Sequence, residues 1–250
     1  MENRPVPLFA ENAGPLTGSG NNTYLLDGPE PMLVDAGVGR AAHVDAVAAA
    51  LAGRPLARVL LTHGHPDHAS GLPALRARWP AVVACQWGVE PAPGWQPLSD
   101  GDVVSSGALS LTVLHTPGHA ADHVCFWDPV ERVIFGGDMV LEHTTVMIPA
   151  GHGGGLAAYL ASLERLAALR PARLYPGHGP VIEQPVRLIR AYVAHRRQRE
   201  QQVLSCLARG EATVEAIVDR IYPDLAPGLR DAARLTVEAH LQKLRQEGRA

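Results

Sequence analysis

The stretch that most constrains this chain is RVLLTHGHPDHASGL, residues 58–72. An apolar run typical of a buried strand leads directly into three histidines and one aspartate within six positions. Imidazole and carboxylate groups at this spacing are ligands for a first-row metal ion such as Zn²⁺, and alternate residues of one loop can converge on one ion. His63 and His65 therefore predict one metal site, and Asp67 and His68 predict a second site beside it.

Four ligands do not complete two metal sites, so the remaining chain must supply others. Three candidates each follow a β-like run and stand beside glycine or proline, which suit tight loops. They are His119 in LHTPGHAADH, Asp138 in VIFGGDMV and His178 in LYPGHGP. Three such residues after three predicted strands favour a metal centre over incidental side chains.

The first 185 residues alternate β-like and helical runs, whereas the rest of the chain is helical. We expect strands at 23–28, 31–37, 58–62 and 81–85, β-rich pieces at 102–119 and 124–138, and a strand followed by a loop at 173–179. Helices are expected at 40–53, 70–80 and 156–169, and Thr213 is expected to cap a short helix near the C-terminus. This pattern predicts a catalytic domain at 1–185 and a helical domain at 186–250 that includes a connecting helix.

The quoted segments resemble the metallo-β-lactamase superfamily. That resemblance implies an α+β fold, the αββα sandwich, with metals at one edge of its paired sheets. It implies two groups of three ligands and one bridging carboxylate: His63, His65 and His119; Asp67, His68 and His178; and Asp138. A bridging aspartate is typical of the hydrolase and nuclease members, so we do not expect a true β-lactamase.

Further segments narrow the resemblance. GNNTYLLDG, TPGHAADHVCFW, GDMVLEHTTV and HRRQREQQVL are similar to the lactamase-β-2-like branch, which carries a small helical domain after the sandwich. Some members of that branch are endoribonucleases that act on single-stranded RNA. The last helices resemble a winged-helix domain, but only six residues follow Leu244, too few for the usual strands and wing. Sequence-specific DNA binding is therefore not expected.

We expect a dinuclear metal-dependent hydrolase in which a metal-bridging hydroxide attacks an ester-like bond. Two divalent ions are implied, zinc first, with manganese or iron as alternatives. Asp67 is the residue expected to act in catalysis, by orienting the hydroxide. The leading substrate is single-stranded RNA, and the alternative is a thioester, ester or lactone, as for glyoxalase II or a lactonase. An iron-dependent oxidoreductase and a non-catalytic metal-binding protein are the hypotheses from other classes.

The feature that favours RNA is an uneven charge distribution. Residues 1–185 hold 10 Lys+Arg against 17 Asp+Glu, while residues 186–250 hold 12 against 8. Five basic residues of the last helical segment are candidates for phosphate contacts: Arg230, Arg234, Lys243, Arg245 and Arg249. A solvated basic surface, a lid over the substrate or the surface of a homodimer are the alternatives.

Several residues receive secondary expectations. Asp35 is expected to orient a ligand or tie a loop, and His123 and His143 to be proton donors, ligand-orienting partners or ordinary core histidines. The glycine-rich IPAGHGGGL is expected to be a flexible loop rather than a phosphate cradle. Three scattered cysteines and the absence of a secretory signal predict a cytoplasmic protein, and no apolar run is long enough to span a membrane.

Overall fold

The computed structural model describes residues 5–14, 17–142, 145–148, 154–211 and 213–250. The chain folds as two compact units. The first comprises Met1–His115, Asp122–Thr144 and Pro171–Pro185, and the second comprises Thr116–Ala121, Thr145–Arg170 and Val186–Ala250. One boundary between the units lies at residue 185. Two earlier segments nevertheless group with the C-terminal helices, because the helix in 145–170 packs within that unit.

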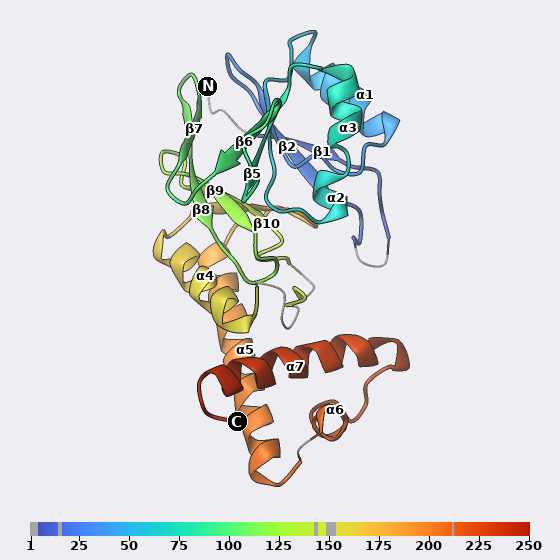
Figure 1. The fold of residues 1–250 in the computed structure, drawn as a ribbon, viewed down its shortest axis with the longest axis vertical. Coiled ribbons are helices and arrows are strands. Elements are labelled where there is room, and N and C mark those ends of the chain that lie inside the picture. Colours follow the sequence, from blue (N-terminus) through green and yellow to red (C-terminus); the bar gives the residue numbers. More distant parts are fainter. Residues whose placement is uncertain (1–4, 15–16, 143–144, 149–153, 212) are drawn as a thin grey trace. The chain divides into compact units, whose positions relative to one another are not determined.

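The first unit contains a sheet of six strands in chain order. They are β1 (Val6–Phe9), β2 (Asn22–Leu26), β3 (Met32–Val34), β4 (Arg58–Leu60), β5 (Val83–Trp87) and β6 (Trp95–Leu98). The pairs β1–β2 and β2–β3 are antiparallel, and the pairs from β3 to β6 are parallel. Two helices, α1 (Ala41–Leu51) and α3 (Leu72–Arg78), lie in the crossovers that parallel strands require, and Figure 1 shows them beside this sheet.

The second sheet of this unit has the order β11-β10-β9-β8-β7. Its strands are β7 (Val103–Ser106), β8 (Leu109–His115), β9 (Val124–Asp128), β10 (Val133–Gly137) and β11 (Arg173–Pro176). Hairpin neighbours β7 to β10 pair antiparallel, and β11 pairs parallel with β10. The two sheets are the paired sheets of the expected sandwich.

Two apolar layers hold the first unit together. Met32 and Val34 of β3 face a core between the two sheets that also contains Phe126, whereas Leu33, between them, faces a second core with α1 and α3. Alternate residues of a strand point to opposite faces, so a sheet covered on both sides is apolar along its length. The run PMLVDAG has this composition because β3 is buried on both faces.

The second unit is helical where the structure describes it. It contains α4 (Leu156–Ala168), α5 (Pro185–Ala208), α6 (Val214–Ile221), a 3₁₀ turn (Pro227–Leu229) and α7 (Arg230–Gln246). Thr213 Oγ1 accepts a hydrogen bond of 3.2 Å from Ala216 N, so the predicted helix cap is confirmed. Val203, Ile217 and Val237 form the core between α5, α6 and α7.

Three elements were not predicted from the sequence: β1, β6 and the short helix α2 (Pro66–Ala69). Pro97 within β6 obscures a strand pattern, because proline is depleted in strands. Pro66 starts α2 inside the histidine motif itself, and this places Asp67 and His68 on a helical turn rather than on an extended loop. None of the helices in the described residues has the length and apolarity needed to cross a membrane.

Candidate metal centre

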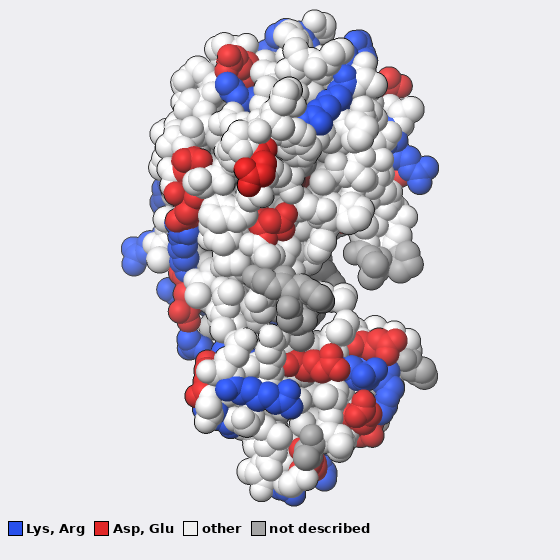
Figure 2. Space-filling view, in the orientation of Figure 1, with Lys and Arg blue, Asp and Glu red and all other residues white. Residues whose placement is uncertain are grey.

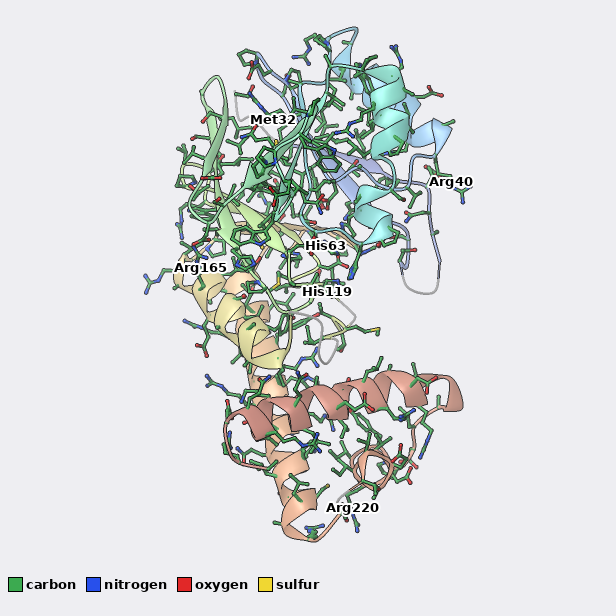
Figure 3. All side chains as sticks on the ribbon, viewed as in Figure 1. Met32, Arg40, His63, His119, Arg165 and Arg220 are labelled. Carbon is green, nitrogen blue, oxygen red and sulfur yellow. The ribbon has the colours of Figure 1, made fainter. Side chains whose placement is uncertain are left out.

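The predicted ligands of the first unit follow the C-terminal ends of three strands. His63 stands just after β4, where Figure 3 labels it, and His65 is the residue immediately before α2. Asp138 directly follows β10, and His178 follows β11 by two residues. The topology therefore brings together side chains that lie more than one hundred residues apart in the chain.

The side chains meet in two overlapping groups that share His68. Within each group, one potential ligand atom from every residue lies within 4.8 Å of the others: His63, His68 and Asp138 in one, and Asp67, His68 and His178 in the other. His178 Nε2 lies 3.3 Å from Asp67 Oδ2 and 3.5 Å from Asp138 Oδ2. His65 adjoins the cluster, since its Nδ1 lies 2.9 Å from His63 Nε2.

His68 has the orientation of a metal ligand. Its ring is fully buried, and Nδ1 lies 2.7 Å from Asp35 Oδ2 in a hydrogen bond. The opposite nitrogen, Nε2, makes no hydrogen bond of good geometry among the described residues and lies 3.4 Å from Asp138 Oδ1 and 3.6 Å from Asp67 Oδ2. An imidazole with one nitrogen held by a carboxylate and the other directed at acidic oxygens suits a divalent cation. These residues therefore fit the implied metals.

Asp35 holds the start of the histidine motif. Besides His68, its carboxylate accepts hydrogen bonds from Thr62 N at 2.8 Å and from Thr62 Oγ1 at 3.0 Å. Asp35 adopts a left-handed backbone conformation with φ 62°, which is unusual for a residue other than glycine. Three hydrogen bonds to one buried carboxylate maintain that conformation. The contacts match the orienting role that the sequence suggested for this residue.

Asn21 and Asn22 contribute to the site and were not predicted to do so. The fully buried Asn21 donates from Nδ2 to Asp67 Oδ2 at 3.1 Å, and this nitrogen lies 3.4 Å from His178 Nε2. Asn12 Nδ2 in turn donates to Asn21 Oδ1 at 2.6 Å, which fixes the orientation of the amide. The signal was present in GNNTYLL, because two amides at the start of a buried strand must find hydrogen-bond partners.

Asn22 fastens the loop that carries His178. Its Nδ2 donates to Pro176 O at 3.1 Å and to Gly179 O at 2.8 Å, and its backbone N donates to Gly177 O at 2.8 Å. Strand β2 therefore positions both Asp67, through Asn21, and the His178 loop, through Asn22.

Two glycines allow the ligand loops to approach one another. A Cβ at Gly177 would lie 2.6 Å from both Asp138 Oδ1 and His68 Cε1. A Cβ at Gly137, where φ is +47°, would lie 2.6 Å from His123 Nε2. The glycines beside the predicted ligands are therefore required by space, as the sequence indicated.

The remaining histidines have different positions. His123 is fully buried, and its Nε2 accepts a hydrogen bond of 3.2 Å from Asp138 N, so it orients the backbone that carries that ligand. His143 and residues 149–153 of IPAGHGGGL lie outside the described residues. His119 belongs to the second unit, where its Nδ1 lies 2.9 Å from Met147 O.

Opposite charges dominate the electrostatics of the cluster. Burial opposes ionisation of Asp67, but His178, His68 and Asn21 lower its pKa to about 2. Burial likewise opposes the charge on Asp138, yet His68 and His178 hold its pKa well below the usual range. Burial lowers the pKa of His178, but its hydrogen bonds with Asp138 and Asp67 raise that pKa to about 9. The pocket thus stabilises two carboxylates by surrounding them with positive charge, which bound cations would also supply.

The basic surplus of the C-terminal helices is largely paired within the second unit. Arg230 contacts Asp219 at 2.8 Å, and Arg234 contacts Glu215 at 3.3 Å. Glu200 receives both Lys243 at 2.6 Å and Arg249 at 2.8 Å. Figure 2 shows acidic and basic side chains interspersed over the visible face of these helices. Four of the five residues expected to meet phosphates therefore have acidic partners, and the excess of charge does not indicate a continuous basic surface.

Comparison with known proteins agrees with this architecture. Residues 16–178 match the Metallo-beta-lactamase superfamily, and residues 213–250 match the Beta-lactamase associated winged helix domain. The chain belongs to the metallo-β-lactamase superfamily, with the expected helical domain after the sandwich. Like its superfamily it is a metal-dependent hydrolase, as predicted.

Two relatives and one solved structure illustrate the similarity. The chain is 31% identical to the Beta-lactamase-like protein 2 homolog of Caenorhabditis elegans, over 96% of this chain and 84% of that protein. It is 34% identical to the Atrochrysone carboxyl ACP thioesterase of Aspergillus fumigatus, over 89% of this chain and 76% of that protein. The crystal structure of a metallo-beta-lactamase family protein from Thermus thermophilus matches with a TM-score of 0.75 and 26% identity, over 98% of this chain and 93% of that one.

Proposed function

We propose that this protein hydrolyses acyl thioesters at a centre of two divalent metal ions. The observation that carries the proposal is the convergence of His63, Asp67, His68, Asp138 and His178 in one unit, with His65 beside them. The choice of a thioester as the bond that is hydrolysed is supported by the relatives named as ACP thioesterases. Thioesters were the alternative to single-stranded RNA that the sequence left open, and we place them ahead of RNA.

Within this proposal the ligands divide as the family resemblance implies. The resemblance implies that one ion would be held by His63, His65 and His119 and the other by Asp67, His68 and His178, with Asp138 as a ligand common to both. His119 is assigned by the resemblance and by its place in LHTPGHAADH. Such ions supply a nucleophile at neutral pH and polarise the carbonyl that is attacked.

The chain's own residues keep this chemistry in place. Asp35 holds Nδ1 of His68, so that Nε2 faces the carboxylates of Asp138 and Asp67, and Asn21 holds one oxygen of Asp67. This same oxygen faces His68 and His178, so Asn21 orients the part of Asp67 that would bind a metal ion and orient the attacking water, the catalytic role proposed for this residue. A thiolate leaves more readily than an amine or alkoxide, so the mechanism does not depend on a strong proton donor.

Two features decide against RNA as the first choice. Four of the five basic residues expected to contact phosphates are paired with acidic residues, which reduces their attraction for a polyanion. Aromatic residues make up 5% of the chain, few for stacking successive bases. Zinc is proposed as the native metal, and the three buried cysteine thiols support the proposed cytoplasmic location.

The test is hydrolysis of a simple thioester. Purified protein reconstituted with Zn²⁺ or Mn²⁺ is incubated with decanoyl-pantetheine, and the released thiol is measured with a colorimetric reagent. An Asp67→Asn variant and a labelled single-stranded RNA are tested in parallel. Thiol release by the parent, lost in the variant, supports the proposal. A metal-loaded parent that cleaves the RNA and leaves the thioester intact would overturn it.

A further inference from the structure

We propose that a groove between α4 and α5 of the second unit binds an acidic amphipathic helix of an acyl-carrier domain. This inference rests on the proposed thioesterase function, because a carrier domain is the protein form in which an acyl thioester is presented. The groove has a volume of about 670 Å³ and lies between the C-terminal part of α4 and the N-terminal half of α5.

The floor of the groove is apolar and shallowly contoured. From α5 it receives Ile189, Val193 and Ala194, and from α4 it receives Ala167 and Ala168. Ile189 and Val193 lie four residues apart and therefore on one face of α5, and Ala167 and Ala168 are neighbours at the C-terminal end of α4. The small alanine side chains of the groove leave space for the apolar face of another helix. That helix would bind through apolar side chains spaced three or four residues apart.

The rim of the groove is mainly positive. Arg190 and Arg197 stand two turns apart on the same face of α5, and Arg170 follows α4. Glu164 is the one acidic residue among those that line the groove, and it contacts Arg197 at 2.7 Å. Arg165 of the same helix projects outward from α4 in Figure 3 and adds positive charge nearby. The groove therefore combines an apolar floor with a net positive border.

This combination favours an acidic helix over the other anionic partners. A single-stranded RNA requires aromatic platforms for its bases, and none of the described lining residues is aromatic. A small metabolite requires an enclosed cavity with convergent polar groups, whereas here the arginines are exposed at the border of an apolar strip. An amphipathic helix with acidic flanks places apolar residues on the floor and carboxylates beside the arginines, which increases the rate and selectivity of association.

Direct binding tests the inference without any hydrolysis. The probe is a fluorescently labelled bacterial acyl carrier protein bearing its phosphopantetheine arm but no acyl group. Its binding to the full chain is followed by anisotropy at low and moderate salt. We expect the double variant Arg170→Glu/Arg190→Glu to weaken binding at least tenfold. The control Arg209→Glu/Arg245→Glu makes the same change of net charge at exposed positions outside the groove and is expected to bind as the parent does.

Three outcomes would overturn the inference: no binding by the parent, equal weakening in both double variants, or displacement of the carrier by a single-stranded RNA that binds the same arginines. Steady-state hydrolysis tests the docking groove separately from the proposed thioesterase function. If the parent hydrolyses decanoyl-pantetheine, the groove variant should raise KM for the decanoyl-carrier thioester alone, with kcat and the pantetheine reaction unchanged. A parent that hydrolyses neither thioester refutes the proposed function, whereas equal KM values in parent and groove variant refute the docking groove.

Discussion

The side-chain amide of Asn21 donates a hydrogen bond of 3.1 Å to Asp67 Oδ2, across 46 residues of sequence. One oxygen of a carboxylate in the metal centre is therefore oriented by a residue at the start of β2 that is not itself a predicted ligand. Asn12 keeps the amide in this orientation by donating to Asn21 Oδ1. The two asparagines form a support for the centre.

Replacement of Asn21 by alanine is expected to weaken Zn²⁺ binding by about 10- to 100-fold, the usual effect of removing a residue that orients a ligand. Competition with a chromogenic chelator measures the affinity. Ser205→Ala is the control, because it removes an exposed hydrogen bond within α5. An Asn21→Ala protein that folds and keeps the affinity of the parent would show that Asp67 needs no such support.

Replacement of Asp35 by asparagine tests the buried carboxylate at the base of the motif. Asparagine tolerates the left-handed conformation, so the backbone is retained, but its amide nitrogen takes the place of Oδ2 and cannot accept the hydrogen bond that His68 Nδ1 donates there. We expect the free energy of unfolding to fall by about 2–3 kcal/mol, the cost of leaving buried donors unsatisfied. Urea denaturation measures this change, and an unaltered midpoint would contradict it.

Gly177→Ala tests whether space alone determines the geometry of the centre. The added methyl group would lie 2.6 Å from Asp138 Oδ1 and from His68 Cε1, so both side chains must move although no ligand is removed. We expect at least a tenfold loss of metal affinity and destabilisation of about 1–3 kcal/mol, as for other overpacked sites. Gly228→Ala is the matched control, since a Cβ there meets nothing within 4 Å. Full metal content after dialysis of the Gly177→Ala protein would refute the prediction.

The pH dependence of stability can be predicted for His240 of α7. Its ring is fully buried, and burial together with the charge of Arg196 lowers its pKa to about 4, with Arg199 and Lys243 acting in the same sense and Glu200 opposing them. Histidine in the unfolded chain has a pKa of about 6.5, so between these values the unfolded chain binds the proton more readily. Stability from this residue is complete above pH 6.5 and is lost as the pH falls towards 4.

The variant His240→Leu isolates that contribution. Relative to the parent it should gain stability as the pH is lowered from 7 to 4.5, by at most about 3 kcal/mol, because leucine takes up no proton. Urea titrations of both proteins at several pH values measure the difference. A difference that is constant with pH would mean that His240 is already protonated in the folded protein or remains neutral in both states.

The centre could be predicted from the sequence to the extent that its signals are local. His63, His65, Asp67 and His68 lie in one motif, and Asp138 and His178 stand just after strands with glycine beside them, so composition and position make them candidate ligands. Asn21 escaped notice because its role depends on a partner 46 residues away. The pairing of basic with acidic residues in the C-terminal helices could not be predicted for the same reason. A count of basic residues does not reveal that Glu200 receives both Lys243 and Arg249.

The contacts of Asn21 and Asn22 with the loop that carries His178 also determine when the candidate centre is completed during synthesis. Asn21 and His178 are 157 residues apart, and the histidine motif lies between them. At about 5–20 residues per second, a ribosome exposes Asn21 and the motif several seconds before residue 178 emerges. During that interval the four residues of the histidine motif are present without His178 and the strand β11 that positions it. The candidate centre is therefore complete only once residue 178 has emerged, and a chain truncated before β11 would lack one of its proposed ligands.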